Sequence, residues 1–239
     1  MLAFGLTTWG DWYNIGSNTI PFVDMDTTGD GVPDFETYVT KPAGSDVLLA
    51  VTTDLGAEGF PMVDAQPVNG QFGDVDINVF DTNVIVLPVT LVALGIDPTA
   101  ASAPITYTTG VSGFYTGPGD ADGVIDVTGP VLFDALTPGL WTQGGGDPAL
   151  AYLARPGTTL VVNRDGEAAT EQRAEDLLVI HHHNASGDRA QVVDVRVPLQ
   201  LPLTQLPVPP VPVPPVPVSA VPVLPTPAPP GAEQPAPAG

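Results

Sequence analysis

The stretch TIPFVDMDTTGDGVPDFETYVT, residues 19–40, holds two segments rich in β-branched and aromatic residues, joined by an acid-rich turn. Gly, Pro and Asp between such segments are typical of tight turns, so the pattern predicts two neighbouring antiparallel strands. Segments of the same kind recur at 46–54, 75–80, 83–93, 105–115, 158–164, 176–183 and 189–197. The spacing predicts an all-β fold.

We expect this fold to be an antiparallel β-sandwich, either immunoglobulin- or fibronectin-like or jelly-roll-like, over residues 1–197, as one domain or two small subdomains. Charges cluster at 166–176 without a sustained apolar face, which predicts a loop or one short helix there. The polar residues after the segment 176–183 predict a hairpin turn into the segment 189–197.

Composition limits the classes of function. The chain has 239 residues and no cysteine, which excludes disulfides, thiolate zinc sites and cysteine nucleophiles. Six basic residues against 27 acidic ones give a formal charge of −21, which disfavours nucleic acid and anionic membranes and favours cations. No apolar run is long enough to span a bilayer, and the first residues lack the features of a secretory signal.

The composition changes after Val197. Sixteen of the 29 prolines follow it, and the segment LPVPPVPVPPVPV is nearly uncharged. Proline removes backbone donors and favours extended polyproline II, so residues 198–239 are expected to be a disordered stalk or linker rather than a packed domain. P-x-x-P spacing also leaves a ligand for proline-reading domains as an alternative.

The acid-rich turn matches an oxygen-ligand calcium loop. Aligned to ligand positions 1, 3, 5, 7 and 9, the chain places there Asp26, Thr28, Asp30, the carbonyl of Val32, and Asp34. A glycine stands at position 6, where the loop turns sharply. Thr28 replaces the usual carboxylate or amide, and position 12 lacks the bidentate Glu, for which Asp24 or Glu36 would have to substitute. The alternative is an Asx-type turn with solvated carboxylates.

Other acidic motifs are weaker. Asp120, Asp122 and Asp126 repeat the pattern of the loop but have proline at its first ligand position, which favours a plain turn. An aspartic-protease reading of the first loop fails because an extra threonine interrupts D-T-G and no second copy exists to share a proton. Asp74, Asp76 and Asp81 are interpreted as a solvent face or edge protection.

Histidine and aromatic residues supply two further hypotheses. On a strand, His181 and His183 would share one face and offer half of a zinc site, the alternative being ring packing at a strand end. Trp9, Trp12 and Tyr13 are candidates for an aromatic ligand-binding platform, with core packing as the alternative.

Five pieces in order, FGLTTWGDW, DTTGDGVPDF, VDAQPVNG, FDTNVIVLPV and LLVIHHHNASGDRAQVV, cover most of residues 3–195. Together they resemble the C-terminal region of large secreted bacterial subtilisin-like serine peptidases. The resemblance implies a β-sandwich beside a peptidase domain, in a secreted or cell-envelope protein. The family's catalytic triad motifs are absent from this chain.

These observations predict a non-catalytic accessory module that stabilises or positions a serine peptidase with the help of calcium. The alternative is a free-standing cell-surface binding module for glycan or protein, using exposed aromatic side chains. A zinc hydrolase built on the histidines is the third hypothesis.

Overall fold

The computed structural model describes residues 1–16, 19–71, 74–113, 123–143, 161–174, 176–184 and 189–195. Its strands are β1 (Leu2–Trp12), β2 (Thr19–Asp26), β3 (Phe35–Thr40), β4 (Leu49–Asp54), β5 (Met62–Pro67), β6 (Gly70–Gln71), β7 (Asp74–Val75), β8 (Thr82–Val89), β9 (Pro104–Gly113), β10 (Val124–Val127), β11 (Val131–Asp134), β12 (Leu140–Gln143), β13 (Val161–Arg164), β14 (Asp176–Ile180) and β15 (Ala190–Asp194). Helical structure in these ranges comprises a 3-10 turn, η1 (Val92–Leu94), and one short helix, α1 (Gly166–Glu171).

Every strand pairing is antiparallel. The predicted all-β antiparallel fold is therefore confirmed, as is a single short helix within 166–176. The described residues all belong to one unit, Met1–Val197. The proline-rich stalk predicted for residues 198–239 lies outside the described residues.

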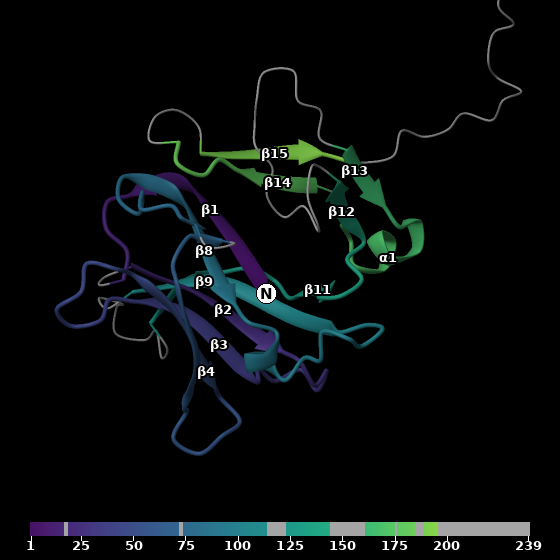
Figure 1. The fold of residues 1–239 in the computed structure, drawn as a ribbon, viewed down its shortest axis with the longest axis horizontal. Helices are drawn as coiled ribbons and strands as arrows, with labels where there is room; N and C mark the ends of the chain where they lie inside the picture. The colour runs from purple at the N-terminus through teal and green to yellow at the C-terminus, as the bar shows by residue number, and fades with distance from the viewer. Residues whose placement is uncertain are drawn as a thin grey trace, which may run out of the picture. The chain divides into compact units, whose positions relative to one another are not determined.

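One large sheet dominates the fold. Seven strands form it, in the order β10-β9-β2-β3-β4-β5, with β11 also pairing with β9. Strands β1 and β8 form a second sheet. This two-stranded sheet crosses the large sheet and lies against β3, β4 and β5 (Figure 1). The remaining pairs are β6-β7, β12-β13 and β14-β15.

The hydrophobic core lies between the large sheet and the β1-β8 pair. Strand β8 contributes an almost continuous buried run, as expected for a strand covered on both faces. The ring of Phe4 on β1 meets Tyr107 on β9 edge to face, with ring centroids 5.2 Å apart. The fully buried apolar side chains of the core include Val23, Met25, Val39, Ala50, Ile85, Leu87, Val89 and Ile105.

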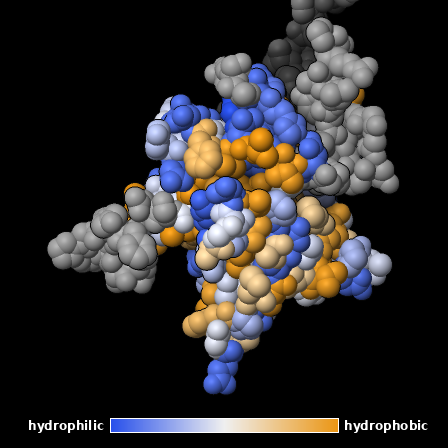
Figure 2. Space-filling model, turned by 60° about the vertical axis from the view of Figure 1, so that its left-hand side comes forward, coloured by the Kyte–Doolittle hydropathy of each residue, from blue (hydrophilic) through white to orange (hydrophobic). Residues whose placement is uncertain are grey.

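The hairpin β2-β3 sets the two faces of the large sheet. Val23 and Met25 enter the core, so Asp24 between them points to the opposite face, where it lies across from Glu36. Not all core-side residues are apolar: the buried hydroxyls of Thr37 and Thr52 bond each other across β3 and β4 at 2.8 Å. On the surface view, hydrophobic residues also reach solvent between hydrophilic ones (Figure 2).

The hairpin β14-β15 packs on the outer side of β1. Gly5 has no side chain there, and a Cβ atom on it would lie 2.7 Å from Cδ1 of Ile180 and 3.5 Å from Cδ2 of Leu178. A glycine at this point therefore lets the hairpin approach the strand closely.

Aspartate side chains close several connections by accepting backbone N–H groups. Asp134, at the end of β11, accepts from the hydroxyl of Ser102 at 2.5 Å and from the backbone N–H groups of Ala103, Leu136 and Thr137. Burial opposes its ionisation, but these donors hold the pKa of Asp134 well below its usual range. Asp64 on β5 likewise accepts the N–H of Thr90 after β8 at 2.7 Å.

Two sequence expectations about strands were wrong. The segment 75–80 is not a strand, because β7 ends at Val75 and Asp76 begins an irregular loop whose bonds run to other parts of the chain. Strand β14 ends at Ile180, before the histidines, so the connection to β15 is longer than predicted. The hairpin itself is confirmed by its antiparallel register, Leu177 opposite Val193.

The close contact at Gly110 on β9 gives a test of the large sheet. A Cβ atom there would lie 2.6 Å from the backbone oxygen of Asp126 and 2.7 Å from Cζ of Phe22. Because the backbone cannot give way cheaply, Gly110→Ala is expected to lower the free energy of unfolding by about 1–3 kcal/mol. Chemical denaturation measures it. Gly129→Ala is the control, since among the described residues no atom beyond its two chain neighbours lies within 4 Å of its added Cβ, and equal stability of the two variants would contradict the packing described.

Candidate functional site

The acid-rich loop between β2 and β3 is closed from its two ends by aspartates. Asp26, buried at the end of β2, accepts the backbone N–H groups of Thr28 and Gly29 on Oδ1, at 3.1 and 2.6 Å, and that of Gly31 on Oδ2, at 2.8 Å. The glycines fit because Gly29 and Gly31 have φ of 78° and 86°, in the left-handed region.

Asp34 closes the loop from the other side. Its Oδ2 atom accepts the N–H and hydroxyl of Thr27, at 2.8 and 2.9 Å, and the N–H of Thr28, at 3.0 Å. Its own N–H donates to the carbonyl of Met25 at 2.8 Å. Partial desolvation opposes ionisation of Asp26, but the loop N–H groups, led by that of Gly31, hold the pKa of Asp26 below its ordinary value.

The predicted calcium ligands are therefore only partly gathered. Thr28 bridges Asp26 and Asp34, whereas Asp30 is exposed and accepts the N–H of Val32 on Oδ1 at 2.8 Å. Within the described ranges, no group of three or more His, Asp or Glu side chains is placed to hold a metal ion. The loop thus has the bonds of Asx-type turns, and calcium binding stays a prediction.

The weaker metal candidates are outside this loop. Asp24 and Glu36 form a directly opposed cross-strand pair on β2 and β3. Burial raises the pKa of both carboxyls, and the charge of Asp24 raises that of Glu36 further. Asp126 is exposed on β10 and accepts the N–H of Val127. Asp120 and Asp122 lie outside the described residues.

The histidines do not form the strand geometry expected of a zinc pair. They follow the end of β14, and His183 has a φ of 56° in a turn. The N–H of His181 donates to the carbonyl of Arg189 at 2.9 Å, which closes the base of the hairpin connection. The alternating faces of a strand therefore do not apply to His181 and His183, and this part of the zinc hypothesis is corrected.

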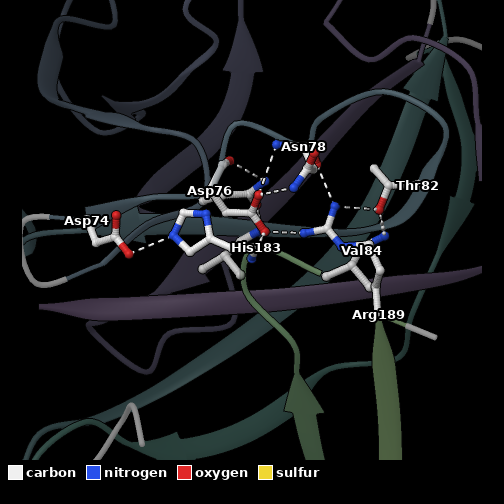
Figure 3. A network of polar contacts seen from close by, with 9 residues as sticks. Asp74, Asp76, Asn78, Thr82, Val84, His183 and Arg189 are labelled. Atoms are coloured by element: carbon white, nitrogen blue, oxygen red, sulfur yellow. Dashed lines mark hydrogen bonds and ion pairs between the residues drawn. The ribbon is translucent and has the colours of Figure 1, made fainter. Parts of the chain in front are cut away.

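A buried ion pair joins the hairpin β14-β15 to the loop before β8. Nη2 of Arg189 meets Oδ2 of Asp76, and the two residues are only 8% and 1% exposed (Figure 3). The N–H of His183 donates to the same Asp76 oxygen at 2.9 Å. Oδ1 of Asp76 accepts the backbone and side-chain N–H groups of Asn78, both at 2.9 Å. Asp76 is therefore a structural anchor, which corrects its interpretation as a solvent-face residue.

The guanidinium of Arg189 also holds the far end of that loop. Its Nη1 atom donates to the carbonyl of Asn78 at 2.7 Å and to the hydroxyl of Thr82 at 3.2 Å (Figure 3). Burial opposes ionisation of Asp76, but backbone N–H groups and the charge of Arg189 hold its pKa below the ordinary value.

A second, exposed contact accompanies the buried pair. Nε2 of His183 lies 2.7 Å from Oδ2 of Asp74 (Figure 3). The hydrogen bond and charge of Asp74 raise the pKa of His183, and the bond to His183 lowers the pKa of Asp74. Asp76, His182 and Arg189 also lie beside this contact, and the charge of Asp76 raises the pKa of His183 further.

The aromatic candidates separate into buried and exposed residues. Trp12 is 8% exposed and belongs to the core, so its place in an exposed platform is wrong. Trp9 is fully exposed and Tyr13 is 83% exposed. A shallow pocket of about 260 Å³ is lined by Tyr13, Asn14, Phe80 and Asp81.

Sequence reasoning missed Arg189 and the role of Asp76. The two residues stand 113 positions apart, so no local pattern joins them. The sequence did hold one signal, which is the scarcity of basic residues: with six in the whole chain, each arginine is a candidate partner for a buried acid.

Comparisons with protein-family models, with curated proteins and with solved structures found no match. The resemblance to subtilisin-like peptidases therefore stays a prediction. In the part of the chain that the structure describes, no helix has the length and apolar character needed to cross a membrane.

The buried ion pair predicts a large effect of removing its cation. Arg189→Met leaves the carboxylate of Asp76 buried without its counter-charge, and is expected to lower the free energy of unfolding by about 3–5 kcal/mol. Urea denaturation measures this. Lys41→Met is the matched control, because it removes the ion pair of Lys41 and Asp46, in which both side chains are exposed, and no measurable loss is expected. Similar losses in the two variants would contradict a special role for Arg189.

The contact of His183 with Asp74 predicts a pH dependence. Because the folded-state pKa of His183 is raised above 6.5, this contact stabilises the fold fully below about pH 6.5 and loses its effect as the pH rises through the raised value. NMR titration of the His183 ring is expected to show a lower pKa in Asp74→Asn than in the unchanged protein. Asp46→Asn, far from the contacts named, should leave the titration unchanged. An unchanged pKa in Asp74→Asn would refute the assignment.

Proposed function

We propose that residues 1–197 are a non-catalytic accessory module that stabilises or positions a neighbouring domain, which the resemblance suggests is a secreted subtilisin-like serine peptidase. The supporting observation is that the polar side chains singled out by the sequence analysis make hydrogen bonds that stabilise the fold. Asp26, Asp34 and Asp76 accept backbone N–H groups and so hold connections between strands in place, and the ring of His183 contacts Asp74. Such use is expected in a rigid scaffold.

Calcium assistance is the second part of the proposal. The loop is already folded around Asp26 and Asp34, so an ion would have to reorient the exposed side chain of Asp30 but would not have to order the loop backbone. The second oxygen of Asp30, Oδ1 of Asp34, the Thr28 hydroxyl and the Val32 carbonyl are the oxygens available to it. With few charged ligands, the affinity belongs in the range of extracellular modules, about 10⁻⁴ to 10⁻³ M.

The position of the loop explains how calcium would act on the whole module. It connects β2 and β3, which occupy the middle of the seven-stranded sheet. An ion bound only by the folded loop stabilises the folded state by mass action. A secreted or cell-envelope location, where millimolar calcium is normal, fits this affinity and belongs to the same proposal.

The calcium proposal is tested by thermal unfolding of the full chain in chelator and in millimolar calcium. Calcium is expected to raise the melting temperature by a few degrees. Asp30→Ala should abolish this rise, because the variant lacks one carboxylate ligand. Toward the described residues, the side chain of Asp30 makes one bond, to the N–H of Val32, so its loss should barely change the melt in chelator.

Asp97→Ala serves as the matched control. Asp97 also accepts the N–H of the residue two positions on, that of Thr99 at 2.8 Å, but lies in a different turn. This variant should keep the full calcium response. Identical melting in chelator and calcium, or a response that survives Asp30→Ala, would show that the carboxylates of this loop serve only to close it.

A further inference from the structure

The pocket lined by Tyr13, Asn14, Phe80 and Asp81 lies where two chain segments leave the β1-β8 sheet. Trp12, the final residue of β1, pairs with Thr82, the first residue of β8. Tyr13 follows the first of them and Asp81 precedes the second. Each segment thus brings one aromatic ring and one polar side chain to the pocket.

Both aromatic rings are exposed on well-anchored backbone. Tyr13 and Phe80 are 83% and 57% exposed, and both line the same pocket. On one side, the buried residues Trp12 and Ile15 flank the segment of Tyr13. On the other side, the buried residues Val79 and Thr82 flank that of Phe80. The exposure is therefore a feature of an ordered surface.

The ion-pair network fixes the second segment further. Nη1 of Arg189 bonds the Asn78 carbonyl and the Thr82 hydroxyl, so it holds the chain on both sides of Phe80 and Asp81. Asp81 has a φ of 47°, in the left-handed region that non-glycine residues rarely adopt. Aspartate adopts this region more readily than most side chains do, and the bonds on both sides of it hold the segment in this conformation.

The chemistry of the lining matches one class of ligand. A sugar ring has an apolar C–H face that packs on aromatic rings and hydroxyl edges that both donate and accept hydrogen bonds. Asn14 offers a donor and an acceptor, and Asp81 offers acceptors. Ligand sites typically combine apolar walls with a few polar groups. The volume of about 260 Å³ has room for one sugar ring.

The negative charge of the chain favours neutral over acidic sugars as ligands. The chain carries a formal charge of −21, and Asp81 is part of the pocket wall, so acidic polysaccharides are repelled. We infer that this pocket binds a neutral sugar ring of an oligosaccharide, with Tyr13 and Phe80 as the stacking surfaces and Asn14 and Asp81 as hydrogen-bonding groups. This binding activity goes beyond the proposed accessory role and does not rest on it or on calcium.

The inference is tested by calorimetric titration of the full chain with four neutral hexasaccharides: β-1,4-linked glucose, N-acetylglucosamine and xylose, and α-1,6-linked mannose. A hexasaccharide of galacturonate is the acidic comparison. At least one neutral sugar is expected to bind saturably. Tyr13→Ala and Phe80→Ala should each weaken it about tenfold, whereas Tyr13→Phe should retain binding because the ring remains.

Phe60→Ala is the matched control, because Phe60 is 62% exposed and, like Asp81, has a φ of 47°, but lies outside the pocket. It should leave the affinity unchanged. Thermal melts of all variants confirm that each is folded. The inference is overturned if no neutral sugar binds, if only the acidic one does, or if binding survives both ring deletions. A Phe60→Ala loss equal to that of Phe80→Ala would also overturn it.

Discussion

The buried ion pair of Asp76 and Arg189 is the constraint that joins the hairpin β14-β15 to the loop before β8. Removing two charges from water costs several kcal/mol per ion, and only good geometry with further hydrogen bonds offsets that cost. The surroundings meet most of this demand, and of the side-chain polar atoms of this pair only the buried Nε of Arg189 lacks a partner among the described residues. Asn78, Thr82 and the N–H of His183 supply those bonds, and they come from both the loop before β8 and the hairpin β14-β15. Satisfying one ion pair therefore fixes the relative positions of two elements that are far apart in sequence.

The acidic character of the chain has a structural use. Asp26, Asp34, Asp64 and Asp134 each accept two or more hydrogen bonds, including backbone N–H groups, and each closes a connection between strands. A carboxylate suits this task because it accepts several donors at once and binds them more strongly than a neutral oxygen does. In this fold, aspartate carboxylates thus accept many of the backbone N–H groups of irregular loops, which need partners when they are buried.

Local sequence patterns predicted the strands with regular alternation and strong turn signals, such as β2, β3 and β4, and the short helix near Asp165. They did not predict β1, because its glycines interrupt the local strand pattern and it pairs with residues about 80 positions later. They placed a strand at 75–80 because Val, Ile and Phe occur there, whereas tertiary bonds of Asp76 override the local preference. At the acid-rich loop the sequence singled out Asp26, Asp30 and Asp34, but only the geometry shows that Asp26 and Asp34 close the loop, whereas the exposed carboxylate of Asp30 accepts the N–H of Val32.

Loops tied by carboxylates respond to a different chemical signal from loops tied by cystine. With no cysteine in the chain, reductants and oxidants leave these ties untouched. Protons do not, because the lowered pKa values of Asp26, Asp64 and Asp134 mean that their stabilisation is complete above the ordinary carboxyl pKa of 3.8 and is lost as acid protonates them in the fold. Strong acid is thus expected to loosen these connections between strands.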